Sequence, residues 1–184
     1  MNTSFQSCSR TKWASFGDSA TETPCSVHAA CLAGLSTLHV ASSCPTNQRS
    51  GENACIECLD YGGDLAMVRN KEDQAFLTNM TFQYGQQNSS EDFHSAWIGL
   101  QDMVKEGTFF WVNGDTVKLN VMYWMDLEPN NAMAAWNTSQ AAQDCVAIVP
   151  PTRIEGEDWL NNWDDIICNG RRHYICETTA LILG

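Results

Sequence analysis

Oxygen-bearing side chains that could hold a metal ion gather in three short clusters in the second half of the chain. They are Glu128 and Asn130, which flank Pro129; Gln143 and Asp144; and Asp164 and Asp165. Hard cations such as Ca²⁺ take about six to eight oxygen ligands, commonly carboxylates and amide carbonyls from loops. A disulfide between Cys145 and Cys168 would bring the second and third clusters together. Ordinary polar loops would give the same pattern, and the residues alone favour that simpler interpretation.

Histidine and cysteine, the usual carriers of nucleophilic chemistry, form no catalytic signature in this sequence. The four histidines are His28, His39, His94 and His173. None of them lies in a metal-binding or catalytic spacing. The stretch "CIEC", from Cys55 to Cys58, has the spacing of a redox motif, but it lies inside a predicted helix and follows no strand. We therefore expect structural disulfides rather than redox chemistry, and no enzyme activity.

Composition and charge narrow the choice of partners. The chain has 184 residues, of which 43% are hydrophobic and only 17% charged, so it can bury a core as one domain with an elaboration. Its net charge is −12, and no basic stripe is present. Phosphate backbones would be repelled by this charge, which excludes nucleic acid as a partner.

Cysteines and glycosylation sequons point to an oxidising compartment. The chain has nine cysteines and four sequons, at Asn2, Asn79, Asn88 and Asn137. Together these features favour a secreted, extracellular protein. No apolar stretch approaches the roughly 20 residues that span a bilayer, so we expect no membrane insertion, and "MNTSFQSCSR" lacks the apolar core of a signal peptide. An odd cysteine count leaves one thiol for a disulfide-linked homo-oligomer.

The elements that must position these residues are two early helices and a later set of strands. The spacing of Ala54, Cys58 and Tyr61 predicts a helix that stops at Gly62, and Asn70 is the expected N-cap of a helix over "NKEDQAFLTNM". Strand-like runs are "DLAMV", "AWIGL", "TFFWVNG", "CVAIV", "DWLNNW" and "HYICE". The pattern predicts an α+β fold. Residues 20–49, rich in Ser, Thr, Ala and Cys, are expected to be irregular.

Several motifs, taken in order, resemble the C-type lectin-like domain. They are "GGDLAMVRNKEDQAFL", "AWIGLQD", "EGTFFWVNG", "YWMDLEPN", "DCVAI" and "NNWDDIICNGRRHYICE", within residues 50–177. The resemblance implies two helices, two small antiparallel sheets and a long loop region that binds Ca²⁺ and sugar. The lectin-like domain would occupy residues 50–184. Residues 1–49 would hold a first strand at 10–19 and an insertion.

The same resemblance implies disulfides and a binding site. Cys58 would pair with Cys176 and Cys145 with Cys168, which leaves the pairing of the remaining cysteines open: Cys8, Cys25, Cys31, Cys44 and Cys55. The primary Ca²⁺ and sugar ligands would be Glu128, Asn130, Gln143, Asp164 and Asp165. In this family Glu-Pro-Asn, with a cis proline, marks sites for mannose, fucose, glucose or N-acetylglucosamine, whereas Gln-Pro-Asp favours galactose.

The sequence departs from the family in the second ligand pair. Gln143 stands where Glu is expected and Asp164 where Asn is expected, so the total charge is unchanged but the order of acid and amide is reversed. An auxiliary Ca²⁺ site is implied at Asp102, Glu106, Asn131 and Asp144. Trp136 is a candidate sugar-stacking residue, although core burial is the default for any tryptophan.

Two functions from different classes follow from these observations. The first is a secreted Ca²⁺-dependent protein that binds glycans or glycoproteins through vicinal hydroxyls of mannose, fucose or N-acetylglucosamine. The alternative is a protein-interaction or structural module, including an ice-binding one, in which the altered pair reflects a lost sugar role.

Overall fold

The computed structural model describes residues 26–30, 37–43, 48–87, 94–132 and 142–179. Its helices are α1 (Gly51–Asp60) and α2 (Lys71–Gln87). Its strands are β1 (Ser26–Ala30), β2 (Thr37–Ser43), β3 (Asp64–Leu65), β4 (Ala96–Gln101), β5 (Phe110–Trp111), β6 (Cys145–Ile148), β7 (Trp163–Ile166), β8 (His173–Tyr174) and β9 (Cys176–Thr179). These elements confirm the predicted α+β fold. None of the described helices is long and apolar enough to cross a membrane.

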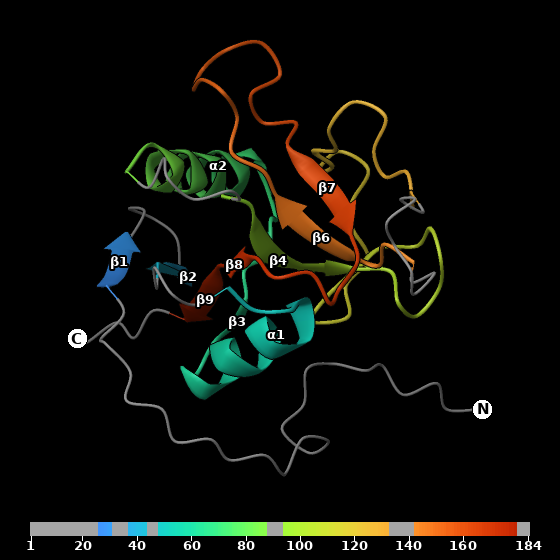
Figure 1. Cartoon of the computed structure of the whole chain (residues 1–184), viewed down its shortest axis with the longest axis horizontal. Coiled ribbons are helices and arrows are strands. Elements are labelled where there is room, and N and C mark those ends of the chain that lie inside the picture. Colours follow the sequence, from blue (N-terminus) through green and yellow to red (C-terminus); the bar gives the residue numbers. More distant parts are fainter. Residues whose placement is uncertain (1–25, 31–36, 44–47, 88–93, 133–141, 180–184) are drawn as a thin grey trace.

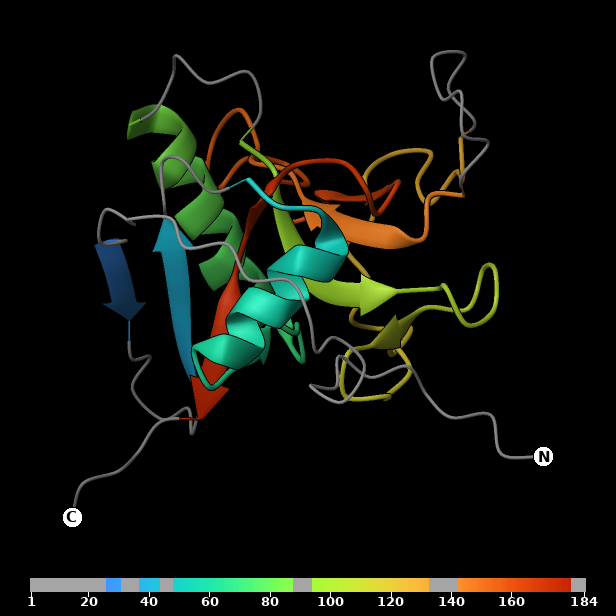
Figure 2. The ribbon, with the colours of Figure 1, turned by 60° about the horizontal axis from the view of Figure 1, so that its bottom comes forward.

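The strands form two small sheets. One has the order β1-β2-β9-β3, and its β1, β2 and β9 lie side by side in Figure 2. The other has the order β5-β4-β6-β7, with β8 added alongside β4. Every pairing is antiparallel except that of β4 with β8. The long loops, drawn in yellow, lie at the end of the molecule away from β1 and β2 (Figure 1).

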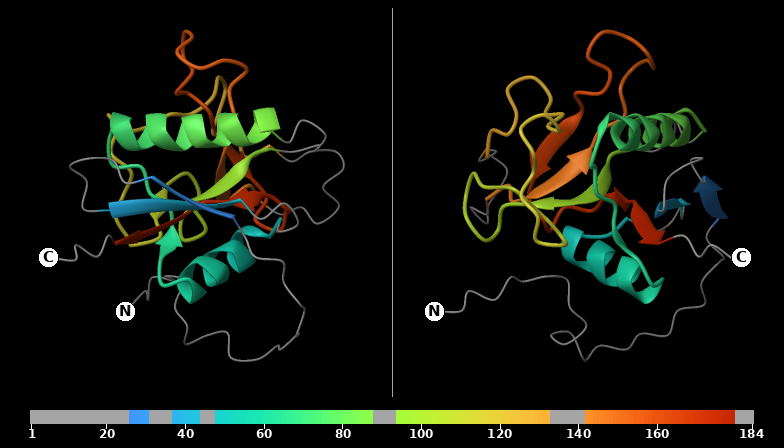
Figure 3. Two further views of the ribbon diagram at one scale, coloured as in Figure 1. Left: turned by 90° about the vertical axis from the view of Figure 1, so that its left-hand side faces the viewer. Right: turned by 180° about the vertical axis from the view of Figure 1, so that it is seen from behind.

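Helix α1 ends and helix α2 begins where the sequence predicts, but α2 continues to Gln87, beyond the predicted segment that ends at Met80. The Ser50 hydroxyl accepts a hydrogen bond from the Asn53 amide at 3.4 Å at the start of α1, and Gly62 follows its end with φ +78°. Asn70 caps α2, since its side-chain oxygen accepts the Asp73 amide at 2.8 Å. The helices lie on opposite sides of the strands (Figures 1 and 3). They therefore enclose the core from two directions.

The strands also differ from the sequence prediction. The predicted runs "DLAMV" and "TFFWVNG" contain only the short strands β3 and β5. Residues 26–30 and 37–43, expected to be irregular, form β1 and β2, and β2 pairs with β9 from the far end of the described chain. Pairing between such distant segments leaves no local signal. The run "DWLNNW" is not a strand before Trp163, because Leu160 and Asn162 bond to the Gln74 side chain of α2 instead of a neighbouring strand. The expected first strand at 10–19 lies outside the described residues.

Two disulfides join cysteines that both lie in the described residues, and both match the pairing that the family resemblance implies. Cys58 of α1 bonds to Cys176 of β9, and Cys145 of β6 bonds to Cys168 after β7. Their sequence separations of 118 and 23 correspond, by loop-closure entropy, to about 5 and about 3 kcal/mol. Cys55 is also disulfide-bonded. Since Cys58 pairs with Cys176, "CIEC" is not a redox pair.

Candidate metal centre

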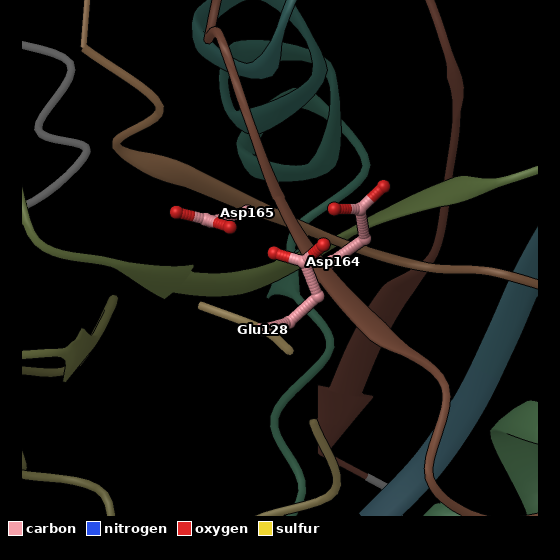
Figure 4. Close-up of side chains that lie close together, drawn as sticks. All are labelled: Glu128, Asp164 and Asp165. Atoms are coloured by element: carbon pink, nitrogen blue, oxygen red, sulfur yellow. The ribbon is translucent and has the colours of Figure 1, made fainter. Parts of the chain in front are cut away.

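Three carboxylates from two separate segments meet at one end of the second sheet. Asp164 and Asp165 lie on β7, and Glu128 lies on the loop between β5 and β6. One oxygen from each lies within 4.8 Å of the others (Figure 4). We call these three residues the acid cluster. Among the residues that the structure describes, no other group of three His, Cys, Asp or Glu side chains is as close.

Backbone hydrogen bonds fix the Glu-Pro-Asn loop to β7. The Met125 amide donates to the Trp163 carbonyl at 2.9 Å. The two oxygens of Asp165 accept the amides of Asn130 and Asn131, at 3.1 and 2.8 Å. The Glu128–Pro129 peptide is cis, as the family resemblance implies. Asp165 is only 1% exposed. It therefore has two roles, since it belongs to the acid cluster and also holds the loop against β7.

The two amide residues of the primary set, Asn130 and Gln143, are connected to the acid cluster in different ways. The Asn130 side-chain nitrogen donates to Glu128 Oε1 at 2.6 Å, so this amide lies directly beside the acid cluster. Gln143 is connected through its backbone, whose amide donates to Asn131 Oδ1 at 2.9 Å. Its side-chain oxygen Oε1 is buried and has no hydrogen-bond partner among the described residues. The structure therefore brings four of the five predicted primary ligands into contact and ties the fifth to their loop.

The predicted auxiliary set centres on Asp102. This side chain is 2% exposed; Oδ2 accepts the Gly107 amide at 2.8 Å, while Oδ1 has no partner in the described part of the chain. Burial, and secondarily the negative charges of Glu106, Asp144 and Asp165, raise the pKa of Asp102 to about 6. Asp144 is close, since its carbonyl accepts the Asp102 amide at 3.1 Å. Three of the four auxiliary residues, Asp102, Glu106 and Asp144, are thus close enough for their charges to interact.

Burial, together with neighbouring negative charges, raises the pKa of two carboxylates of the acid cluster. Burial, a hydrogen bond with Asp165 and the charges of Asp164 and Asp165 raise the pKa of Glu128 to about 7. Burial, followed by the charge of Asp165, also raises the pKa of Asp164, while Arg172 opposes this rise. A cation bound among these carboxylates would favour their charged forms and so lower their pKa values. The donors are all carboxylate and amide oxygens, and two buried oxygens, on Asp102 and Gln143, lack partners among the described residues. This chemistry fits a hard divalent ion such as Ca²⁺.

A buried set of polar residues beside the cluster was missed from the sequence. Gln74 of α2 donates from Nε2 to the Leu160 carbonyl at 2.6 Å and to Asn162 Oδ1 at 2.7 Å, and its Oε1 accepts Trp163 Nε1 at 2.9 Å. Asn162 in turn donates to Thr78 Oγ1 at 3.2 Å. We call Gln74, Thr78, Asn162 and Trp163 the polar hub. A polar Gln74 beside Leu77 and Thr78 on one helix face is its only sequence signal.

Several predicted site residues cannot be placed near the cluster. Trp136 and the sequons at Asn2, Asn88 and Asn137 lie outside the described residues. Asn79 is exposed on α2, where its side-chain oxygen accepts the Gln83 amide at 3.3 Å. Its glycosylation stays a prediction.

The fold and the site define a class of protein: a small disulfide-bonded α+β domain with a cluster of carboxylates, on β7 and the loop before β6, that could hold a metal ion. The family described as "Lectin C-type domain" matches residues 47–178. The chain therefore belongs to the C-type lectin domain family. This family is generally non-enzymatic, in keeping with the absence of a catalytic signature in the sequence.

The curated relatives are longer proteins. CD209 antigen-like protein A of Mus musculus is 29% identical over 143 residues, which cover 76% of this chain and 49% of that protein. CD209 antigen of Symphalangus syndactylus is 30% identical over 135 residues, covering 73% of this chain and 29% of that protein. The chain thus spans less than half the length of either relative.

Solved structures show the same fold at lower identity. The carbohydrate-recognition domain of the mouse scavenger receptor C-type lectin has a TM-score of 0.62 and 21% identity, and the match covers 86% of this chain and 100% of that one. A calcium-independent type II antifreeze protein has a TM-score of 0.57 and 18% identity, over 84% and 98% of the two chains. The expected C-type lectin-like fold is confirmed.

Proposed function

We propose that this domain binds carbohydrates in a Ca²⁺-dependent manner through two vicinal hydroxyls of mannose, fucose or N-acetylglucosamine. The observation that carries this proposal is the acid cluster, with Asn130 hydrogen-bonded to Glu128 at its edge. Membership of the C-type lectin domain family, and the likeness to a carbohydrate-recognition domain of solved structure, support carbohydrate binding as the general activity. Localisation outside the cell is part of the proposal, supported by the disulfides and the sequons.

Each residue of the site has a separate task in this proposal. Glu128, Asp164 and Asp165 would hold the ion, with amide oxygen from Asn130 and Gln143. The ion supplies attraction for two hydroxyl oxygens when it is bound. At one hydroxyl, Glu128 offers an acceptor and Asn130 a donor; at the other, Asp164 is the acceptor and Gln143 the donor. The order of donor and acceptor orients the sugar.

The exchanged pair makes the sugar preference the finer part of the proposal. Gln143 and Asp164 keep the charge of the ligand set but reverse the order of donor and acceptor at the second hydroxyl. Ca²⁺ binding depends mainly on the charge and number of oxygens, so it should be retained. The alternative module without sugar binding draws its support from this same exchange.

Retention on immobilised mannose, compared with galactose, tests the proposed function. We expect retention in Ca²⁺ and release by a chelator. A matched variant is Glu128→Gln with Asn130→Asp, which exchanges acid and amide without changing net charge and should shift retention toward galactose. Retention of the wild-type protein that is unchanged by chelator would refute the Ca²⁺ mechanism. A Ca²⁺ titration without heat and without thermal stabilisation would support the alternative module.

Useful binding at shallow sugar sites needs several sites presented together. The odd number of cysteines supports a disulfide-linked homo-oligomer as part of the proposal. Non-reducing electrophoresis should show a dimer that reduction converts to monomer, and a monomer in both lanes would contradict it.

A further inference from the structure

The turn before Glu128 carries a bulky apolar residue in an unfavourable backbone conformation. Leu127 has φ +68°, in the left-handed region that residues with a branched side chain rarely adopt. At comparable positive φ values, Gly62, Gly107 and Gly114 occupy other turns of this chain. Among the described residues, Leu127 is the only apolar side chain at a positive φ. Glycine would serve this turn better, so the backbone gives no reason for a leucine.

Burial gives no reason for the leucine either. The Leu127 side chain is 83% exposed, so it contributes little to folding through removal of apolar surface from water. Met125, two residues earlier, is also exposed. An exposed apolar side chain in a disfavoured conformation lowers stability without a compensating contact within the described structure. A contact outside this part of the chain would explain it.

The turn is held firmly against the metal centre. The Glu128 amide donates to the Met125 carbonyl at 3.1 Å, which closes the turn around Leu127. The Met125 amide bonds to Trp163, the residue before Asp164. One end of the turn is thus Glu128 of the acid cluster, and the other end is bonded to the residue that precedes Asp164. Consecutive Cα atoms lie about 3.8 Å apart, so Leu127 lies next to any ligand that Glu128 contacts. We call this position the rim of the site.

We propose that Leu127 is a specificity-determining residue that packs against the methyl group of a 2-acetamido or 6-deoxy sugar. The proposal rests on the proposed function, because the hydroxyl pair must first be held at the acid cluster. Glucose and N-acetylglucosamine present the same vicinal hydroxyls, and so do L-galactose and L-fucose. Donors and acceptors that contact only those hydroxyls cannot separate the members of either pair. An apolar side chain beside the site can, and one buried methyl group is worth roughly three- to fourfold in affinity.

Leu119 provides the matched control. It is another exposed leucine of the loop between β5 and β6, 89% exposed, and its φ is not positive. It is not joined to the acid cluster by any hydrogen bond among the described residues. Changes at Leu119 alter exposed apolar surface to the same extent without touching the rim.

The test is competition for retention on immobilised mannose in Ca²⁺, using the full chain. The competitor pairs are N-acetylglucosamine against glucose, and L-fucose against L-galactose. For the wild-type protein we expect the methyl-bearing member of at least one pair to compete at least threefold better. Leu127→Gly and Leu127→Asn should bring that ratio close to one, because both residues accept the turn conformation but lack the apolar side chain. Leu119→Gly should keep the wild-type ratio.

Stability measurements exclude a folding defect, since Leu127→Gly should not lower the thermal midpoint in Ca²⁺. A ratio that persists in both Leu127 variants, an equal loss in Leu119→Gly, or a wild-type protein that does not distinguish either pair would each overturn the role of Leu127. Those three results leave Ca²⁺-dependent retention in place. Absence of any Ca²⁺-dependent retention by the wild-type protein is a different result, and it overturns the proposed function together with this inference.

Discussion

The polar hub and the acid cluster are neighbouring parts of this domain that differ in how their polar groups are paired. They are consecutive in the chain, since Trp163 ends the hub and Asp164 begins the cluster. In the hub, both nitrogen protons and the oxygen of the Gln74 amide have partners within 3 Å. In the cluster, burial and the neighbouring negative charges raise the pKa of Glu128 and of Asp164. The Gln74 amide is thus fully paired within the chain, whereas the cluster keeps three carboxylates within 4.8 Å of one another, with the charge of Arg172 opposing the pKa rise at Asp164.

This difference separates a part that stabilises the fold from the part that we propose binds the ion. The hub joins α2 to the segment before β7, so it sets where Asp164 and Asp165 stand. Its members are buried, with exposed fractions from 0 to 4%. A buried polar group that is fully paired stabilises one geometry, while an unpaired one destabilises the fold. Under the proposed function, the cluster would carry that penalty in the free domain, and a bound Ca²⁺ ion would remove it.

The largest expected effect comes from breaking the hub with Gln74→Leu. This change leaves the Leu160 carbonyl, Asn162 and Trp163 Nε1 without their partner, which should lower the free energy of unfolding by roughly 4 kcal/mol. Urea denaturation in a chelator measures this loss. Ca²⁺ affinity should fall as well, because the hub positions β7.

Leu77→Ala is the matched control for the hub. Leu77 is fully buried on the same helix but packs in the apolar core. Its truncation should cost about 3 kcal/mol of stability and leave Ca²⁺ affinity unchanged. If both variants weakened Ca²⁺ binding equally, the hub would have no positioning role beyond general stability.

The second effect concerns the ion itself. Ca²⁺ at a hundred times its dissociation constant should stabilise the wild-type domain by about 2.7 kcal/mol. Asp165→Asn should abolish this gain, since Asp165 holds two loop amides and supplies a charge to the cluster. Glu52→Gln, which removes an equal charge from the exposed face of α1, should keep it. Thermal melting with and without Ca²⁺ measures the difference, and a gain that survived in Asp165→Asn would place the ion elsewhere.

Local features of the domain could be predicted from the sequence, whereas contacts between distant segments could not. The helix starts at Ser50 and Asn70 follow local rules, although only Asn70 was predicted as an N-cap. The candidate ligands of the metal centre were proposed because the family resemblance sets their order, and their role stays a prediction. The hub depends on contacts between α2 and residues 160–163, and β2 depends on pairing with β9. Neither is visible in a short window of sequence. The exposed Leu127 was also missed, because its significance lies in its φ value and its position at the rim.

The third effect is a dependence of stability on pH in the absence of Ca²⁺. The pKa of Glu128 is raised to about 7 in the folded domain, above its usual value of 4.5. The folded state therefore binds more protons than the unfolded state between these values, and stability falls as pH rises through that window. Glu128→Gln resembles the protonated acid, so in chelator it should be more stable than the wild-type domain at pH 7.5. The advantage should vanish below pH 4.5.

In Ca²⁺ the sign of the pH effect reverses. The ion requires deprotonated carboxylates, so acidification should release it and remove its stabilisation. Thermal midpoints at several pH values, with chelator and with Ca²⁺, give the two slopes. If the slopes had the same sign, the carboxylates of the cluster would not be the groups that bind the ion.

The smallest expected effect, a change of sugar preference, comes from the exchanged pair. The double variant Gln143→Glu with Asp164→Asn restores the acid and amide order of the family while keeping the net charge. Its Ca²⁺ affinity should stay within about threefold of the wild-type value, because the ligand charge is the same. The ratio of mannose to galactose retention should change by roughly three- to tenfold, since one donor and one acceptor at the second hydroxyl trade places. The single variants should move Ca²⁺ affinity in opposite directions, upward for Gln143→Glu and downward for Asp164→Asn. An unchanged sugar ratio in the double variant would mean that Gln143 and Asp164 hold the ion without orienting the sugar.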